Sequence, residues 1–294
     1  MNEANMFPPR FDYQFYVKDK SFLTSPEDAL RHFKTIGLNS GLEGSPACNQ
    51  GYFVNLIKGL NPQSILEIGP GCSPKLQGNN VYYFDVKSEE ELRKRYRGEP
   101  GYNNIPDKIH FTDNDGNLNS INRKFDVVFS SHMIEHSFDL IDHINSVASL
   151  LNENGHYFII APNKNYTFDY FKPVSLPEDV MAHHFSCGNN PALSLRTVLL
   201  EKCRRAHNSP QRHWAGDHGE PMIDHKDVLN AIKNFGVIAN DPIARSGFHS
   251  WIFTDESFAQ LINGLHELNQ IAMKLLEYYN TPLGSCSFTA ILKR

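Results

Sequence analysis

Residues 64–74 decide the fold, and they read Ser-Ile-Leu-Glu-Ile-Gly-Pro-Gly-Cys-Ser-Pro. The apolar residues at 65–68 predict a short strand buried on both faces, which runs directly into a loop with two glycines. Gly69 and Gly71 carry no Cβ, so the backbone can adopt positive φ and a ligand can approach the main chain closely. A nucleoside site and a plain strand-to-helix turn both fit this composition.

Residues near this loop indicate which class of nucleoside ligand it would bind. Asp85 ends the next predicted strand, where a carboxylate can accept hydrogen bonds from both hydroxyls of a ribose. Pro74 occupies the position at which a dinucleotide-binding fingerprint has its third glycine. Glu67 adds a negative charge that would repel a pyrophosphate but can pair with a cationic amino-acid group. We therefore expect a ligand with an ammonium and a sulfonium, and NAD is the weaker alternative.

The pattern around this loop predicts an α/β fold. Short apolar stretches at 81–84, 125–129 and 157–160 alternate with helical stretches, which is typical of a mostly parallel sheet with helices on both faces. Further on, we expect a helix at 224–235, a strand at 248–253, a long helix at 255–279 and a closing strand at 286–292. Residues 1–45 predict an N-terminal helical extension, and the irregular stretch at about 163–222 predicts an acceptor-binding insertion in a domain spanning 46–294.

Composition limits the partners. The 294 residues carry 28 basic and 33 acidic side chains, for a formal charge of -5, and no long basic run. We therefore expect no nucleic acid as partner, and a small molecule or a glycan instead. No apolar run approaches the roughly 20 residues of a membrane helix, and no basic leader precedes an apolar stretch, so we expect a cytoplasmic protein. The five cysteines form no Cys-x-x-Cys pair and predict reduced thiols. The oligomeric state stays open, with a dimer as one option.

Taken in order, these motifs resemble those of class I S-adenosylmethionine-dependent methyltransferases. The resemblance rests on residues 66–71, on Asp85, and on residues 125–136, which read Phe-Asp-Val-Val-Phe-Ser-Ser-His-Met-Ile-Glu-His. It implies a Rossmann-like, doubly wound sheet of seven strands in the order 3-2-1-4-5-7-6, with S-adenosylmethionine as cofactor and S-adenosylhomocysteine as product. The residues that it assigns to the cofactor are Glu67, Gly69, Pro70, Gly71, Asp85, Asp113, Asn114, Ser131 and His132, with the adenine near Asp113 and Asn114.

The acceptor half of the site is read from polar residues after the fourth and fifth strands. Methyl transfer from a sulfonium needs an aligned acceptor and, for a hydroxyl, a base. The candidates for the base are His213, His218, His132 and Asp169, and those for acceptor binding are Tyr166, Trp214, Asp217 and Arg205. Each of these residues could instead have a purely structural role, in a polar surface loop, in aromatic packing or as a charge at a helix end. We do not expect a metal, because a hard-cation site needs several carboxylates in register.

The class of acceptor is suggested by resemblance alone. Residues 13–41, with 166–171, 213–218 and 251–254, are similar to segments of enzymes of bacterial surface-polysaccharide biosynthesis. This implies O-methylation of a hydroxyl on a sugar, a nucleotide-sugar or a polysaccharide end. Methylation of another small metabolite, and an inactive scaffold that only binds the cofactor, remain as alternatives.

Overall fold

The computed structural model describes residues 6–187, 193–241 and 247–294. Residues 188–192, which belong to the predicted insertion, and residues 1–5 of the predicted extension lie outside the described residues. Seven strands form one sheet in the order β3-β2-β1-β4-β5-β7-β6, so the predicted α/β fold and strand order are confirmed. The strands are β1 Ile65–Ile68, β2 Val81–Asp85, β3 Phe111–Thr112, β4 Phe125–Ser131, β5 Leu151–Pro162, β6 Lys274–Tyr279 and β7 Ser287–Lys293.

The central strands are parallel, and β7 is antiparallel to both of its neighbours. All four residues of β1 are buried, as are five of the seven residues of β4, which explains why both strands are mostly apolar. Because β1 and β4 are parallel and adjacent, their carboxyl ends reach the same edge of the sheet. The segments that follow them are therefore neighbours.

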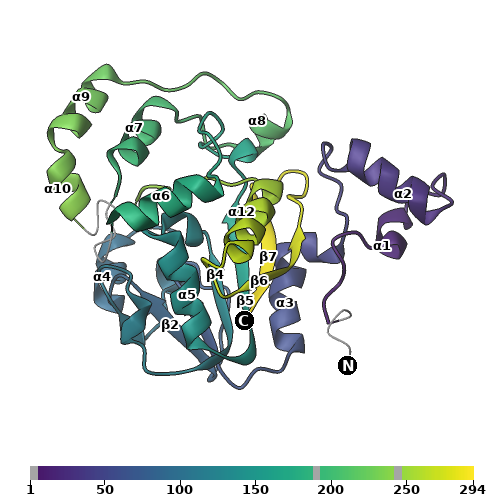
Figure 1. Ribbon diagram of the computed structural model, residues 1–294, viewed down its shortest axis with the longest axis horizontal. Helices are drawn as coiled ribbons and strands as arrows, with labels where there is room; N and C mark the ends of the chain where they lie inside the picture. Colours follow the sequence, from purple (N-terminus) through teal and green to yellow (C-terminus); the bar gives the residue numbers. More distant parts are fainter. Residues whose placement is uncertain (1–5, 188–192, 242–246) are drawn as a thin grey trace.

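Helices cover both faces of the sheet (Figure 1). On one face the apolar core joins the strands to α5 (Leu140–Leu150), α6 (Pro177–Cys187) and α12 (Asp255–Glu267). On the other face, Phe53 and Ile57 of α3 (Gln50–Gly59) pack against Phe129, Phe158 and Ile160. A smaller cluster around Leu92 holds α4 (Glu89–Arg95) beside β2. The sheet is thus a middle layer between two helical layers.

A long insertion separates β5 from α12. It contains η7 (Lys164–Tyr166), α6, α7 (Leu195–Cys203), α8 (Pro210–Trp214), α9 (His225–Lys233) and α10 (Phe235–Asn240). In Figure 1 the helices α7, α9 and α10 lie together in the upper left of the view, and α8 lies apart from them at the upper right. The insertion begins where β5 ends at Pro162, so it starts from the carboxyl edge of the parallel strands.

The N-terminal segment has a small apolar cluster of its own. It comprises α1 (Tyr13–Val17), α2 (Pro26–His32) and a π-helical turn, η2 (Phe33–Gly37), and Tyr16 and Phe33 are almost fully buried in it. Ser25 caps α2 through the N–H of Asp28. Asn280, after β6, ties the segment to the sheet, because its side chain donates to the Leu42 carbonyl and accepts from the Gly44 N–H. Figure 1 shows these helices standing to one side of the body.

Two predictions about the C-terminal third are wrong. The helix predicted at 255–279 ends at Glu267; Asn269 then adopts a left-handed φ of 56°, and the chain returns as strand β6. The apolar spacing of residues 275–279 therefore belongs to a strand that pairs with β7. The strand predicted at 248–253 is irregular, because its backbone bonds to loops: Ser250 and Trp251 both donate to the Glu135 carbonyl. The predicted closing strand is confirmed as β7.

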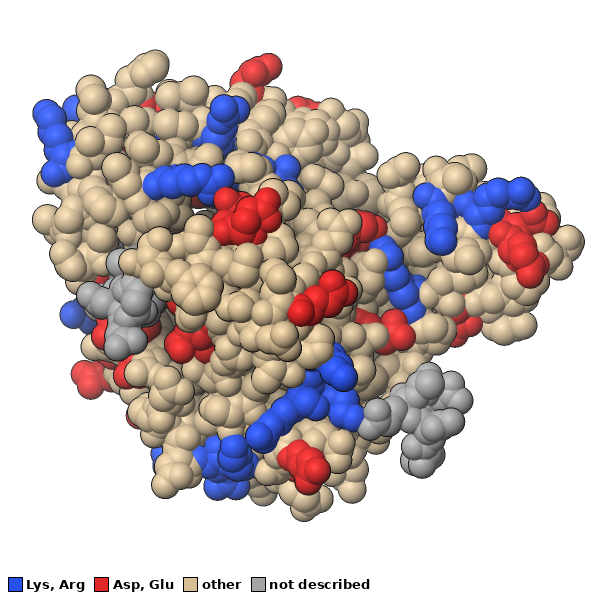
Figure 2. Space-filling model, in the orientation of Figure 1, with Lys and Arg blue, Asp and Glu red and all other residues tan. Residues whose placement is uncertain are grey.

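Surface charge agrees with the composition. Figure 2 shows basic and acidic side chains interspersed on the face in view. Among the described residues, no helix is long and apolar enough to cross a membrane. Cys48, Cys72, Cys203 and Cys286 are free thiols.

The packing of β5 predicts a large cost for truncating Phe158. This ring is fully buried and packs edge-on against Phe7 at 5.6 Å between centroids. Phe158→Ala should lower the free energy of unfolding by about 3–5 kcal/mol in urea denaturation. Phe22→Ala is the matched control, because Phe22 is 68% exposed, and it should change stability by less than about 1 kcal/mol. Equal effects of the two substitutions would contradict this account of the core.

Candidate functional site

The glycine loop has the backbone that the sequence predicts. Gly69 and Gly71 have φ of 71° and 49°, values that favour glycine. A Cβ on Gly69 would lie 3.0 Å from the Cγ of Met133, so the loop after β4 packs directly on the loop after β1. Pro70 is buried between the two glycines. The loop is therefore closely packed on the β4 side.

Glu67 points back under this loop. Its carboxylate is 2% exposed and accepts the N–H groups of Lys75 at 2.8 Å and Leu76 at 3.0 Å. Burial raises the pKa of the Glu67 carboxyl to about 7, and these two N–H donors limit the rise. The carboxylate thus fixes the segment that follows the glycines, a structural task that the sequence did not indicate.

Asp85 lies at the end of β2, beside the same loop. Its carboxylate accepts the N–H of Gly71 at 3.2 Å and of Lys87 at 3.1 Å, and burial raises its pKa. Each oxygen keeps a second lone pair, so the group can still accept from a ligand. Asp113 and Asn114 follow β3; Asp113 accepts the N–H groups of Asp115 and Asn117, and Asn114 is exposed. These two residues shape an exposed turn.

The segment after β4 turns sharply at His132. Ser131 is the last residue of β4, and His132 adopts a left-handed φ of 51°. The ring Nε2 lies 2.7 Å from Ser287 Oγ. Its side chain is 42% exposed, although surrounding protein desolvates the imidazolium and lowers its pKa to about 4. His132 is therefore recessed but reachable from solvent.

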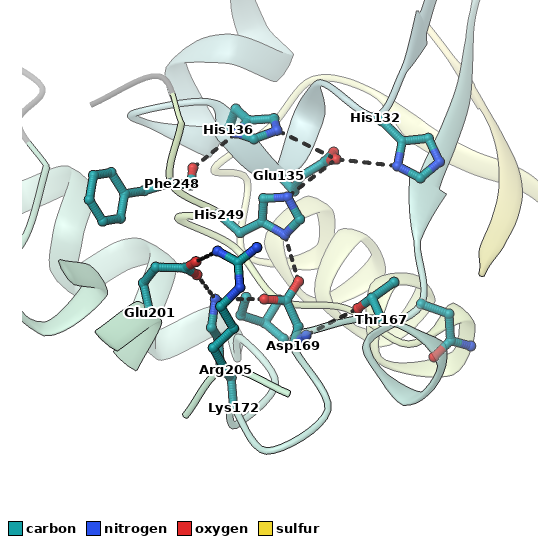
Figure 3. Close-up of polar contacts among 12 residues, drawn as sticks. His132, Glu135, His136, Thr167, Asp169, Lys172, Glu201, Arg205, Phe248 and His249 are labelled. Carbon is teal, nitrogen blue, oxygen red and sulfur yellow. Dashed lines mark hydrogen bonds and ion pairs between the residues drawn. The ribbon is translucent and has the colours of Figure 1, made fainter. Parts of the chain in front are cut away.

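A buried polar cluster lies next to this turn (Figure 3). Glu135 is fully buried, and three imidazole nitrogens face its Oε1: His132 Nδ1 at 3.7 Å, His136 Nε2 at 3.8 Å and His249 Nε2 at 4.0 Å. Neither carboxylate oxygen of Glu135 has a hydrogen-bond partner among the described residues. Burial raises the pKa of Glu135 to about 7, and burial lowers that of His136 to about 3.

Asp169 connects this cluster to the insertion. Its Oδ2 lies 2.5 Å from His249 Nδ1, and its Oδ1 lies 2.6 Å from Lys172 Nζ. Burial alone would raise the pKa of Asp169, but the hydrogen bond and charge of His249 outweigh it and hold the pKa below its usual range. Lys172 also contacts Glu201, which pairs with Arg205 at 2.6 Å. Asp169, a predicted base, is thus engaged by both His249 and Lys172.

The predicted acceptor residues form stacked pairs in the insertion. His213 is buried; its Nε2 lies 3.1 Å from the His207 carbonyl and its Nδ1 lies 3.1 Å from His218 Nδ1. His218 stacks on Tyr170 at 3.8 Å, and Trp214 stacks on Tyr166 at the same distance. Both ring nitrogens of His213 are occupied. His218 is half-buried and remains the more accessible of the two imidazoles.

The two predicted charged acceptor residues already have ionic partners. Asp217 is exposed and pairs with Arg212 at 2.7 Å. Arg205 pairs with Glu201 and lies over the Phe168 ring at 4.6 Å. Arg205 also lines a cavity of about 400 Å³ with Lys202 and Asp227, which form an ion pair of 2.9 Å. These cations are matched by carboxylates.

Four members of the buried cluster, Glu135, His136, Lys172 and His249, were not among the predicted site residues. Glu135 and His136 lie in a single 3-10 turn, and α5 starts only at Leu140. His249 fell in a predicted strand, and Lys172 was not singled out. The one sequence feature that could have indicated a role for Glu135 is that Glu135 and His136 directly follow the apolar residues Met133 and Ile134. No local pattern indicates that His249 meets it from more than a hundred positions away.

Comparisons with known proteins find solved structures of low similarity. No family model and no curated protein matches the chain. Solved structures do. The plantazolicin methyltransferase BpumL, in complex with a triazolic desmethylPZN analog and SAH, is 13% identical over 96% of this chain and 93% of that one, with a TM-score of 0.41. The CcbJ methyltransferase from Streptomyces caelestis is 13% identical over 83% and 94%, with a TM-score of 0.39.

A third similar structure has a different assignment. It is assigned to the Zn-dependent alcohol dehydrogenases of Rhodobacter sphaeroides, and it is 13% identical over 79% of this chain and 85% of that one, with a TM-score of 0.40. At such values the likeness carries no argument about chemistry. The function has to be argued from the residues of this chain.

The position of Glu67 leads to a pH-dependent prediction. Its folded pKa of about 7 exceeds its ordinary value of 4.5, so the folded protein holds this proton more tightly and loses stability as pH rises from about 4.5 to about 7. Glu67→Gln cannot titrate and accepts only one of the two N–H groups. The variant should be less stable at pH 5, and its deficit should shrink by about 1–3 kcal/mol at pH 8.

Urea denaturation at both pH values measures the deficit. Glu153→Gln is the control, since Glu153 is exposed and should give the same small difference at both. A deficit that widens with pH would contradict the assigned titration.

Proposed function

We propose that this protein is an S-adenosylmethionine-dependent methyltransferase that methylates a hydroxyl of a small acceptor. One observation carries the proposal: a positive-φ glycine loop is tied to a buried carboxylate, Asp85, at the carboxyl edge of a 3-2-1-4-5-7-6 sheet. Open α/β sheets bind ligands at this edge. A ribose placed on Asp85 would put the rest of a nucleoside ligand along the loop from Gly69 to Gly71.

The charge beside the loop favours this ligand over a dinucleotide. Glu67 lies two residues before Gly69 and is held in place by two N–H groups. Its negative form opposes a pyrophosphate and favours a cationic ligand. A sulfonium and an ammonium both carry positive charge. In addition, Pro74 stands where a dinucleotide-binding fingerprint has its third glycine.

The acceptor is proposed to lie beside His132. The contact between Met133 and Gly69 places the segment 131–136 against the donor loop. Of the four residues predicted as base, His132 is nearest this loop in the chain and is reachable from solvent. Asp169 is locked in ion pairs and His213 is buried with both nitrogens engaged. We therefore assign proton removal to His132.

A sugar hydroxyl remains our preferred acceptor within this proposal. Tyr166, Trp214 and His218 in the insertion offer aromatic and imidazole groups of the kind that bind sugars. A nucleotide-sugar is less favoured than a plain sugar, because the cations that could bind its diphosphate, Lys202 and Arg205, are already paired with carboxylates.

The donor site is tested by calorimetry with S-adenosylhomocysteine. The wild type should bind it, and Asp85→Asn should bind it roughly 10- to 100-fold more weakly, since a charge-assisted hydrogen bond to the ribose is lost. Asp107→Asn is the matched control, because Asp107 is fully exposed and pairs only with Arg93 among the described residues. Tight binding of NAD without binding of S-adenosylhomocysteine would overturn the proposal.

Labelled methyl donor tests the acceptor and the base. A panel of sugars and nucleotide-sugars, with isoprenoid and aromatic hydroxyl compounds as the second arm, should give turnover with a sugar. His132→Asn should lower kcat by about 10²–10⁴-fold with little change in S-adenosylhomocysteine affinity. Asparagine is chosen because it tolerates the left-handed backbone at this position. If kcat is unchanged in His132→Asn but falls in His218→Asn, the base is His218 of the insertion and not His132.

A further inference from the structure

Glu135 is a buried carboxylate whose surroundings do not satisfy it. The side chain is 0% exposed, and neither oxygen accepts a hydrogen bond from any described residue. Buried carboxylates are otherwise paired, hydrogen-bonded or bound to metals. Its backbone is fixed, because its carbonyl accepts the N–H groups of Ser250 and Trp251. The carboxylate is therefore held in place without a proton donor.

The imidazoles that face Glu135 present lone pairs. His136 Nδ1 lies 3.0 Å from the Phe248 carbonyl, which can only accept, so Nδ1 carries the proton and Nε2 faces Glu135 without one. His249 Nδ1 lies 2.5 Å from the Asp169 carboxylate, which orients that ring in the same way. The two Nε2 atoms lie 3.8 Å and 4.0 Å from Glu135 Oε1. Three electron-pair donors thus converge on one point.

We propose that Glu135, His136 and His249 bind one divalent first-row transition-metal ion. Their ligand atoms all lie within 4.8 Å of one another. Two atoms bound to the same tetrahedral ion at about 2.0–2.2 Å lie about 3.3–3.6 Å apart, so the two histidines must move toward Glu135 and toward each other by roughly 1 Å when the ion binds. This proposal differs from our expectation from the sequence that the protein holds no metal.

The ligand types select the class of ion. Two imidazoles and one carboxylate suit Zn²⁺ or Fe²⁺, whereas Mg²⁺ and Ca²⁺ prefer oxygen ligands. The outer partners fit as well, since metal-bound histidines usually donate their second N–H to a carboxylate or a backbone carbonyl. Here those partners are Asp169 and the Phe248 carbonyl, and Lys172 holds Asp169 in turn. Three protein ligands leave coordination positions open for a further ligand.

The position of the site suggests what fills the open coordination. His136 lies three residues after Met133, which contacts Gly69 of the proposed donor loop. His132 faces the same Glu135 oxygen at 3.7 Å and is reachable from solvent. An acceptor hydroxyl bound to the ion would be acidified and aligned between the donor and His132. This role rests on the proposed function, whereas metal binding itself does not.

The competing arrangement needs no metal. In it, His249 is an imidazolium that pairs with Asp169 and Glu135 together, and His136 Nε2 and Glu135 Oε2 make no hydrogen bond to a described residue. That arrangement predicts no stoichiometric binding of a transition metal. The two arrangements therefore differ in a property that is measured without any turnover.

The experiment is calorimetry with Zn²⁺ on chelator-treated full-length protein. We expect one Zn²⁺ per chain, at least 100-fold weaker binding in Glu135→Gln and His136→Ala, and 10- to 100-fold weaker binding in Asp169→Asn. His225→Ala is the control, because His225 is exposed on α9, and it should bind as the wild type does. Visible absorption of bound Co²⁺ should report nitrogen and oxygen ligation that is lost in His136→Ala.

Two further measurements make the outcomes distinct. Circular dichroism establishes that each variant is folded, and His136→Ala is the safer substitution because this side chain is 28% exposed. Binding of S-adenosylhomocysteine is measured on the same samples. No stoichiometric Zn²⁺, or wild-type Zn²⁺ affinity in folded His136→Ala, overturns the metal site whatever the donor result. Stoichiometric Zn²⁺ without binding of S-adenosylhomocysteine supports the metal site and overturns the proposed function.

Discussion

The parallel pairing of β1 with β4 is the constraint on which the site depends. In this register Ile68 lies beside Ser130, so the chain leaves both strands at the same edge and at nearly the same height. Gly69 must then make room for Met133, and a side chain at position 69 would occupy that space. The loop after β1 and the loop after β4 are separated by some sixty positions in the sequence. This single pairing brings them into contact at one site.

A second set of contacts joins the insertion to that edge. His249 and Asp169 come from opposite ends of the insertion, and their 2.5 Å contact closes it over the segment 132–136. Lys172 and Glu201 extend the contact outward to Arg205 on the surface. Since buried ions are costly unless matched, the insertion can close only when these partners meet together. The insertion and the end of β4 are therefore expected to order as one unit.

The sequence predicted those parts of the fold that local pattern controls. Residues 65–68 read as a buried strand because both of their faces are covered, and the glycines after them mark a backbone that other residues avoid. The helix predicted at 255–279 was wrong because apolar spacing in residues 275–279 suits a helix and a strand alike, and only pairing with β7 decides between them. Glu135 and His249 could not be joined in advance, since their contact depends on how the irregular segment 248–253 folds back.

Charge balance links the metal site to the chemistry proposed beside it. The buried network contains three carboxylates, those of Glu135, Asp169 and Glu201, but only two side chains that are always cationic, Lys172 and Arg205. One negative charge is left over when both facing histidines are neutral. A divalent ion held by Glu135, His136 and His249 would reverse that excess and leave one positive charge. The site would then favour an acceptor oxygen that carries negative charge.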